Sequence, residues 1–202
     1  IYGSAKSLRY RQGGAFGNIS TENSITDNGW IVGGQAQISQ TFNNIYNIGL
    51  EVWANRSFAD LQTKDNIFFQ ETLSYKIKQS IGIAGKFGIV NGSALFYIKP
   101  GILFAKRDIF SQYLSIFMNN GAPIPPHTNK KYMHGFSFGI GADIAIPNTQ
   151  FTVGGEVTAT QYQSFNYIHP MPEGITGDIN TQFKPKTFTF LLKANYKLYS
   201  FS

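Results

Sequence analysis

The chain has 202 residues, and its 17 Lys and Arg against 11 Asp and Glu leave a net charge of +6. Only 14% of the residues are charged, whereas 42% are apolar and 15% are aromatic. This composition argues against intrinsic disorder, and the absence of cysteine excludes a disulfide scaffold or a cysteine metal site. The length suits one domain, which we expect to cover residues 1–202.

No segment approaches the roughly 18 consecutive apolar residues of a membrane-spanning helix, so a helical membrane protein is excluded. The chain opens without a basic stretch followed by an apolar one. We therefore expect that a signal peptide has been removed or was never present.

Alternation of apolar and polar residues with a period of two predicts that nearly the whole chain is β-strand. We assign a first strand to residues 2–12, where alternation is poor, because a closed barrel with both termini on one side needs an even number of strands. Residues 30–42 alternate clearly. Asn43-Asn44 then predicts a tight turn into the next strand, residues 46–54.

Apart from Glu71, Gln79 and Gly85, the odd positions of residues 67–89 carry apolar side chains. Fully extended, this run would measure about 75 Å. It is either one long strand that projects beyond a membrane or a hairpin that turns near Gln79-Ser80. We favour the single strand, because it gives an even count.

Asn91-Gly92 is a strong hairpin signal and leads into a strand over residues 94–104. Pro100 is unfavourable inside a central strand, so we expect a bulge there. A third hairpin joins residues 132–146 to residues 151–165 through the turn 147–149, and a last strand covers residues 187–198. The fold class predicted is all-β, a closed antiparallel eight-stranded up-and-down transmembrane β-barrel.

The composition of the two faces indicates which one meets lipid. The polar face is rich in small or uncharged residues, as at Gly33, Gln35 and Thr158, whereas the other face is crowded with Phe, Ile, Leu, Tyr and Trp. The interior of eight strands is only wide enough for side chains to fill and could not hold so many rings. We therefore expect the apolar face to contact lipid. The alternative is a soluble lipocalin-like carrier in which the aromatic face lines a cavity for a hydrophobic ligand.

Connections of two lengths alternate along the chain. Residues 13–28, 56–66, 107–131 and 166–185 are predicted as long loops, and residues 43–44, 91–93 and 147–149 as short turns. Outer-membrane barrels have short periplasmic turns and longer extracellular loops. The four long loops are accordingly expected outside the cell.

Several strand segments resemble the small eight-stranded outer-membrane β-barrel family typified by the OmpA transmembrane domain and OmpX. They are Gly-Trp-Ile-Val-Gly-Gly at 29–34, Gly-Lys-Phe-Gly-Ile-Val at 85–90, and Leu-Phe-Tyr-Ile-Lys-Pro-Gly at 95–101. The terminal alternation through Tyr196 and Leu198 is similar to the assembly signal of that family. The resemblance implies residence in the bacterial outer membrane of a Gram-negative organism.

A network of inward-facing charges is predicted inside the barrel. Buried charges persist when they are paired and hydrogen-bonded, so we interpret the network as a salt-bridged plug. The surplus of lysine leaves a narrow, anion-leaning pore as the functional alternative. The predicted network consists of Glu51, Lys78, Lys86, Lys99, Asp143, Glu156, Lys193 and Lys197.

Catalysis is not expected. Small barrels of this family include lipid A-modifying enzymes, but His134 and Ser137 lie three residues apart in a strand and therefore point to opposite faces. His127 and His169 fall in different long loops, and no spacing suggests a metal site. No cofactor is predicted.

Two sets of loop residues are predicted to make contacts. Exposed apolar clusters usually mark interaction sites, here with another envelope protein or a host surface. Basic residues near the membrane rim would suit the phosphates of lipopolysaccharide, whereas they are too scattered for nucleic acid. The apolar contact set is Phe110, Tyr113, Leu114, Ile116, Phe117, Met118, Tyr167 and Met171, and the basic set is Lys106, Arg107, Lys130 and Lys131.

The sequence therefore predicts a non-catalytic outer-membrane barrel with a structural or surface-interaction role that its long loops carry out.

Overall fold

The computed structural model describes residues 4–14, 17–58, 61–65, 71–113, 127–169 and 179–198, which form one antiparallel sheet. The sheet order is β2-β1-β11-β9-β8-β7-β6-β4-β3, while β5 pairs with β6 and β10 with β11. No helix in the described part of the chain is long and apolar enough to span a membrane. The strands are β1 (Ser4–Gly14), β2 (Gly17–Gly29), β3 (Ile31–Phe42), β4 (Tyr46–Ser57), β5 (Leu61–Asp65), β6 (Glu71–Asn91), β7 (Ala94–Tyr113), β8 (His127–Ala145), β9 (Phe151–Tyr162), β10 (Phe165–His169) and β11 (Ile179–Tyr196).

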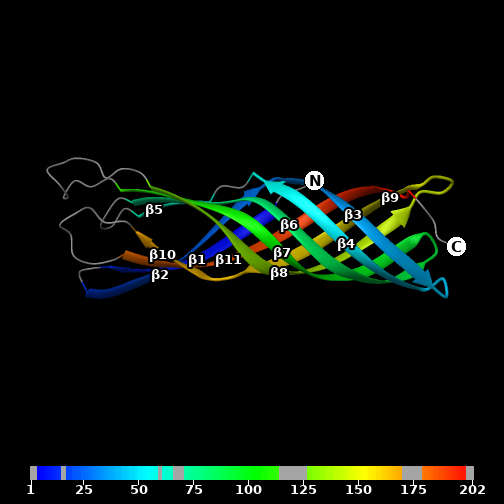
Figure 1. Ribbon diagram of the computed structural model, residues 1–202, viewed down its shortest axis with the longest axis horizontal. Coiled ribbons are helices and arrows are strands. Elements are labelled where there is room, and N and C mark those ends of the chain that lie inside the picture. Colours follow the sequence, from blue (N-terminus) through cyan, green and yellow to red (C-terminus); the bar gives the residue numbers. More distant parts are fainter. Residues whose placement is uncertain are drawn as a thin grey trace.

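These strands make eight up-and-down passes along the molecule. Strands β2 and β3 form one pass that is interrupted only at Trp30, and β9 and β10 form another that is interrupted at Gln163 and Ser164. Strands β4 and β5 form a third composite pass. The predicted antiparallel, eight-stranded arrangement is thus confirmed, and Figure 1 shows the strands running along the long axis of the molecule.

The three predicted short turns lie together at one end, which we call the short-turn end. Asn43, Asn44 and Asn148 have φ values of 50°, 55° and 59°, and Gly92 has a φ of 61°. Asn and Gly tolerate this left-handed backbone best, which explains why these residues occupy the turns. The opposite end, where β1, β5, β7 and β10 finish, is called the long-loop end.

Large apolar side chains face outward across the middle of the sheet. Ile38 and Phe136 are 76% and 69% exposed, whereas Glu51 on the opposite face is fully buried. This arrangement confirms the prediction that the apolar face is the outer one, as in a barrel surrounded by lipid. It contradicts the soluble lipocalin-like alternative, in which the aromatic side chains would line a cavity.

The strands extend further toward the long-loop end than predicted. Residues 13–28 were expected to form a loop, yet most of them form β2, and β5 and β10 occupy parts of two other predicted loops. Strands β7 and β8 likewise run to Tyr113 and from His127, inside the predicted loop 107–131. The reason is that strand segments beyond a membrane have no lipid-facing side, so they lack the apolar alternation that the prediction relied on.

Strand β6 is continuous from Glu71 to Asn91, which confirms the single strand and excludes the hairpin near Gln79-Ser80. Its alternation nevertheless breaks at a β-bulge, because the register with β7 shifts between Ile77 and Gln79 and leaves Lys78 as the extra residue. Ile81 and Ile83 face outward, whereas Tyr75 and Ile77 are buried inside. A single inserted residue therefore turns the odd positions from the outside to the inside.

The bulge that was expected at Pro100 is absent. Pro100 faces Phe138 of β8 with no change of register, and β7 keeps one register with β6 on both sides of the proline. The proline causes a gap in the ladder between β6 and β7, because it has no N–H to donate, but it does not change the register.

Closure was predicted, but the described sheet leaves a slot in its wall near the short-turn end. Strand β1 lies between β11 and β2, and its described pairing ends with Ser4 opposite Thr189 and Gly29. Beyond that point β11 continues to Tyr196 and β3 runs to Phe42, and within the described chain their facing edges have no ladder. A side-chain hydrogen bond from Gln35 Nε2 to Asn195 Oδ1, 2.9 Å long, crosses the slot.

Near the long-loop end the wall divides into two four-stranded sheets. One contains β10, β11, β1 and β2, and the other contains β5, β6, β7 and β8. Strand β8 pairs with β9 only from Gly135 onward, and β10 pairs with β11 in the described chain. The two sheets contact each other through inward-facing side chains. This part of the molecule is consequently built like a β-sandwich, with its apolar residues inside.

Candidate functional site

The candidate site is the interior of the eight-stranded wall. A cavity of about 2160 Å³ extends from Asn44 and Gly92 at the short-turn end to Ile77, Leu103 and Tyr162. Its lining is mostly small or polar, and it also includes the outward-facing Ile38, because the cavity opens through the slot beside β3. Six strands, namely β4, β6, β7, β8, β9 and β11, bring inward-facing charged side chains into this space.

Six of the predicted charged residues form one group, which we call the interior charge cluster. Lys99 lies 2.8 Å from Glu51 and 2.5 Å from Glu156, measured between Nζ and the nearest carboxylate oxygen. Lys193 lies 2.9 Å from Glu156. The cluster consists of Glu51, Lys86, Lys99, Asp143, Glu156 and Lys193.

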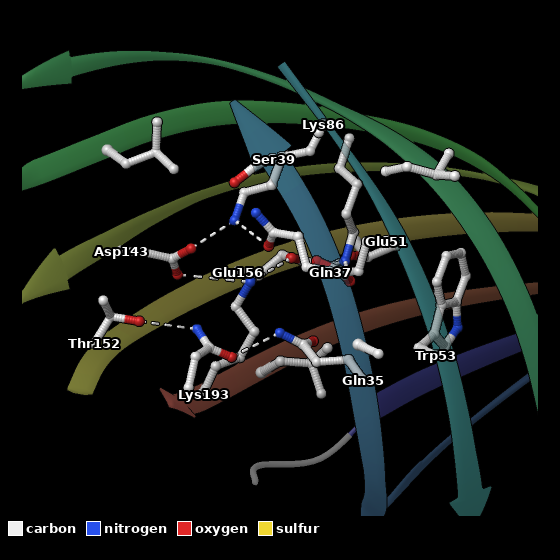
Figure 2. Close-up of a pocket in the computed structure, with 18 of the residues that line it drawn as sticks. Gln35, Gln37, Ser39, Glu51, Trp53, Lys86, Asp143, Thr152, Glu156 and Lys193 are labelled. Carbon is white, nitrogen blue, oxygen red and sulfur yellow. Dashed lines mark hydrogen bonds and ion pairs between the residues drawn. The ribbon is translucent and has the colours of Figure 1, made fainter. Parts of the chain in front are cut away.

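The second half of the cluster surrounds Asp143, as Figure 2 shows. Lys86 Nζ donates to Asp143 Oδ2 at 2.6 Å and to Gln37 Oε1 at 3.1 Å. Lys193 Nζ lies 3.6 Å from Asp143 Oδ1 and so links the two halves. Lys86 is only 1% exposed. Removing any one member would leave the cluster with one charge in excess in a buried site.

Aromatic rings complete the cluster. Tyr97 donates to Glu156 Oε2 at 3.0 Å and accepts a hydrogen bond from Lys193, while Lys86 Nζ lies 3.9 Å from its ring centre. Lys99 lies 5.3 Å from the ring of Trp53. These cation–π contacts stabilise desolvated ammonium groups. The prediction missed both aromatic residues, although Tyr97 lies two residues before Lys99 and therefore on the same face.

Glycines make room for these rings. A Cβ added at Gly82 would lie 2.3 Å from Trp53 Cζ2, and one added at Gly141 would lie 2.3 Å from the Tyr97 hydroxyl oxygen. Each glycine faces the aromatic residue on an adjacent strand. The many glycines on the polar face therefore reflect close packing inside the wall.

The two remaining predicted members lie elsewhere. Lys78 is the bulge residue; its side chain is 48% exposed and pairs with Asp108 at 2.6 Å. Lys197 is exposed and follows the last residue of β11. The interior charge cluster therefore holds three lysines and three carboxylates, and its formal charge is zero. The lysine surplus that suggested an anion-leaning pore is absent from it.

An apolar cluster lies between the charges and the long-loop end. Tyr75 stacks near Phe183 and Phe165, with ring centres 5.9 Å and 6.2 Å away, and its hydroxyl donates to Met133 Sδ at 3.4 Å. Burial raises the pKa of Tyr75 well above its usual range, so the phenol stays neutral. The apolar cluster consists of Tyr75, Ile77, Leu103, Ala105, Ile109, Met133, Tyr162, Tyr167 and Phe183, with Trp53 and Phe165 packed against it.

Arg107 and Tyr167 differ from their predicted positions. Both were expected on the outer surface, but Arg107 is 6% exposed and Tyr167 is 3% exposed. Arg107 occupies an odd position of β7, as do Lys99 and Leu103, and it therefore points inward. Tyr167 belongs to β10 and reaches across the two sheets, where its hydroxyl contacts Ser111 Oγ at 3.1 Å and His127 Nδ1 at 2.8 Å.

The other predicted contact residues fall into two groups. Lys130 and Lys131 are exposed, whereas Lys106 and Phe110 are partly buried. The side chains of Tyr113, Leu114, Ile116, Phe117, Met118 and Met171 lie outside the described residues.

A second cavity of about 440 Å³ lies on the outer surface, at the border of the apolar band. The polar part of its lining includes Arg56, Gln79 and Lys106. The apolar part of its lining includes Val32, Ile81, Phe104 and Tyr132. We call this the rim cavity.

His134 and Ser137 do not meet, and the described side chains form no metal-binding group. His134 is exposed on the outer face and Ser137 is buried on the inner face, as the sequence predicted. The described chain holds no group of three or more His, Asp or Glu suited to a metal ion.

The family comparison identifies one domain type over almost the whole chain. A family model described as "Outer membrane protein beta-barrel domain" matches residues 4–197. No curated protein matches the chain.

Three solved structures resemble the chain at low sequence identity. Ail, the attachment invasion locus protein of Yersinia pestis, has a TM-score of 0.33 and 11% identity, and the match covers 93% of this chain and 97% of Ail. Neisserial surface protein A has a TM-score of 0.26 and 9% identity, covering 93% and 94%. The N-terminal barrel domain of Pseudomonas aeruginosa OprF has a TM-score of 0.28 and 9% identity, covering 92% and 97%.

Proposed function

Since this chain belongs to the family of outer membrane protein β-barrel domains and resides in the bacterial outer membrane, we propose that it acts there without catalysis, as a structural and surface-interaction protein. Its partners would bind at the long-loop end, which we orient outward because outer-membrane barrels carry their longer loops on that side.

The observation that carries this proposal is the blocked interior. The interior charge cluster is formally neutral, and each of its six charges has an ion-pair partner on another strand. The apolar cluster lies between it and the long-loop end. A small barrel filled in this way offers ions no continuous water path. A conducting pore therefore fits the interior less well than a rigid support for the outer segments.

Closure of the wall is part of the proposal. Unpaired backbone groups in lipid cost several kcal/mol each, by a general estimate, so the facing edges of β3 and β11 need a partner. We propose that an extended segment continuing from the N-terminal end of β1 fills the slot, because β1 pairs with both β11 and β2 as far as Ser4. With that segment in the slot, the eight passes form a closed barrel.

Lipopolysaccharide is the second proposed partner, and the rim cavity favours it. Arg56 and Lys106 lie beside Val32 and Phe104 in this cavity. Cations next to an apolar surface suit a phosphorylated lipid, whose phosphate and acyl chain would contact the two parts. The proposed lipopolysaccharide site therefore retains Lys106 from the predicted basic set. It contains Arg56 in place of Arg107, which is buried.

Purification with outer membranes and measurement of conductance test the main proposal. We expect heat-modifiable gel migration and no channel activity in planar bilayers. Sustained conductance of the intact barrel would contradict the blocked interior.

Titration with lipopolysaccharide tests the second partner. Replacing both Arg56 and Lys106 with Gln is expected to weaken binding at least tenfold, whereas Lys197→Gln, at the short-turn end, is expected to leave it unchanged. Equal affinity of the double variant and the parent chain would exclude the rim cavity.

A further inference from the structure

Arg107 is a buried cation that has no counter-charge among the described side chains. It lies on β7, faces Ile77 of β6 and Lys131 of β8 in register, and is 6% exposed. Its Nε and Nη1 atoms are buried without a hydrogen-bond partner. No carboxylate of the described chain forms an ion pair with it, which sets it apart from the paired lysines of the interior charge cluster.

The guanidinium group is held in place from one side. Its central carbon lies 3.3 Å from the centre of the Phe165 ring on β10, and that ring stacks against Phe183 with 5.0 Å between centres. Burial lowers the pKa of Arg107 below its usual value, although arginine remains charged at neutral pH. An unpaired buried charge is destabilising. A bound anion would supply the missing counter-charge, so we interpret the surroundings of Arg107 as a site for an anion.

An open strand edge lies beside this group. Strand β8 pairs with β9 only from Gly135 onward, so residues 128–133 have a free edge toward β10 within the described chain. Lys130 and Lys131 are exposed on this stretch. The edge thus combines unused backbone donors and acceptors with positive charge.

From these observations we propose that Arg107 binds a carboxylate presented by an extended acidic polypeptide, which adds as a strand to the free edge of β8. Backbone hydrogen bonds to residues 128–133 would hold the strand. Alternate side chains of the strand would point inward, where the apolar cluster accepts aliphatic groups and Arg107 accepts one carboxylate. The planar carboxylate matches the planar guanidinium that rests on Phe165.

The proposal rests on the proposed function only in the outward orientation of the long-loop end. Binding to the purified barrel in detergent does not depend on that orientation. Failure of the binding test would therefore leave the proposed function intact.

The test uses two synthetic peptides that differ in one group. The first is acetyl-Thr-Val-Thr-Glu-Thr-Val-Thr-amide, and the second carries Gln in place of Glu. Fluorescence anisotropy measures their affinity for the folded protein, and amide exchange reports on residues 128–133. We expect the Glu peptide to bind at least tenfold more tightly than the Gln peptide and to protect the amides of this edge that point away from β7.

Variants separate Arg107 from general positive charge. Arg107→Gln is expected to abolish the preference for the Glu peptide, whereas Lys184→Gln, which changes an exposed cation on β11 near the same end, is expected to preserve it. Heat-modifiable migration verifies that both variants fold. Acetate is expected to compete with the Glu peptide in the parent chain alone.

Four results would overturn the proposal: no binding of either peptide, equal binding of both, a preference that survives Arg107→Gln, or competition by acetate without any edge protection. Protection of the free edge in the peptide-free monomer would assign the edge to the chain's own segments. Protection that appears only with dimerisation would assign it to a second copy.

Discussion

At the scale of single residues, Glu156 has the most contacts in the interior charge cluster. Its carboxylate contacts Lys99 and Lys193 and accepts hydrogen bonds from Tyr97 and Thr158, the last at 2.8 Å. It therefore joins strands β7, β9 and β11. Neutralising it would leave one lysine charge uncompensated in a buried site.

Glu156→Gln is expected to lower the free energy of unfolding by about 3–5 kcal/mol, because breaking a buried ion pair leaves an unpaired charge. Urea unfolding in lipid vesicles measures the change. Lys197→Gln is the control, and its exposed side chain predicts a change below about 0.5 kcal/mol. Similar stabilities for the two variants would show that the cluster contributes little to the fold.

A substitution at Gly82 tests how closely the Trp53 ring packs against this strand. Gly82→Ala is expected to shift the Trp53 ring and cost about 1–3 kcal/mol through overpacking. Gly34→Ala is the matched control, since a Cβ there has open space. In a Trp30→Phe background, tryptophan fluorescence reports the surroundings of the Trp53 ring alone. An unchanged spectrum together with unchanged stability would contradict the contact between Gly82 and Trp53.

At the scale of elements, the β-bulge at Lys78 decides which face of β6 is apolar. On the short-turn side of the bulge the apolar residues of β6 face outward, and on its long-loop side they face inward. This change of sides lets one strand serve both a membrane band and a sandwich surrounded by water. The exposed ion pair between Lys78 and Asp108 contributes less than the backbone geometry, because surface pairs contribute about 0–1 kcal/mol.

Deleting Lys78 is expected to turn Tyr75 and Ile77 outward and to disrupt the apolar cluster. We expect a loss of about 2–5 kcal/mol, comparable to removing a large buried side chain. Lys78→Ala keeps the extra residue and should cost at most about 1 kcal/mol. Urea unfolding compares the two variants, and equal stabilities would mean that the bulge has no role in burying these residues.

At the scale of the whole molecule, the facing edges of β3 and β11 have no ladder between them among the described strands. We expect that an extension of about eight alternating Val and Thr residues placed ahead of Ile1 will raise the thermal midpoint, because it satisfies two free strand edges. An extension of equal length made of Gly and Ser is the control. Differential scanning calorimetry in detergent measures both, and equal midpoints would contradict closure by a continuation of β1.

The family match confirms the resemblance noted from residues 29–34, 85–90 and 95–101. The predicted strands before and after each short turn are also confirmed. They were predictable because Asn43, Gly92 and Asn148, which have positive φ values, mark the turns. For the interior, parity along β4, β7 and β9 placed Glu51, Lys99 and Glu156 on one face. The same parity, applied eight residues beyond Lys99 on β7, would have placed Arg107 inside.

By itself, the sequence determined seven alternating passes, the short turns and the outward apolar face, because these depend on local periodicity and on turn residues. The first pass followed only from the even strand count of a barrel. Only the tertiary structure decided the balance of the interior charge cluster, the burial of Arg107 and Tyr167, and the slot beside β3. These features depend on register between strands distant in the chain, where one inserted residue such as Lys78 reverses the faces. Periodicity within one segment does not contain that information.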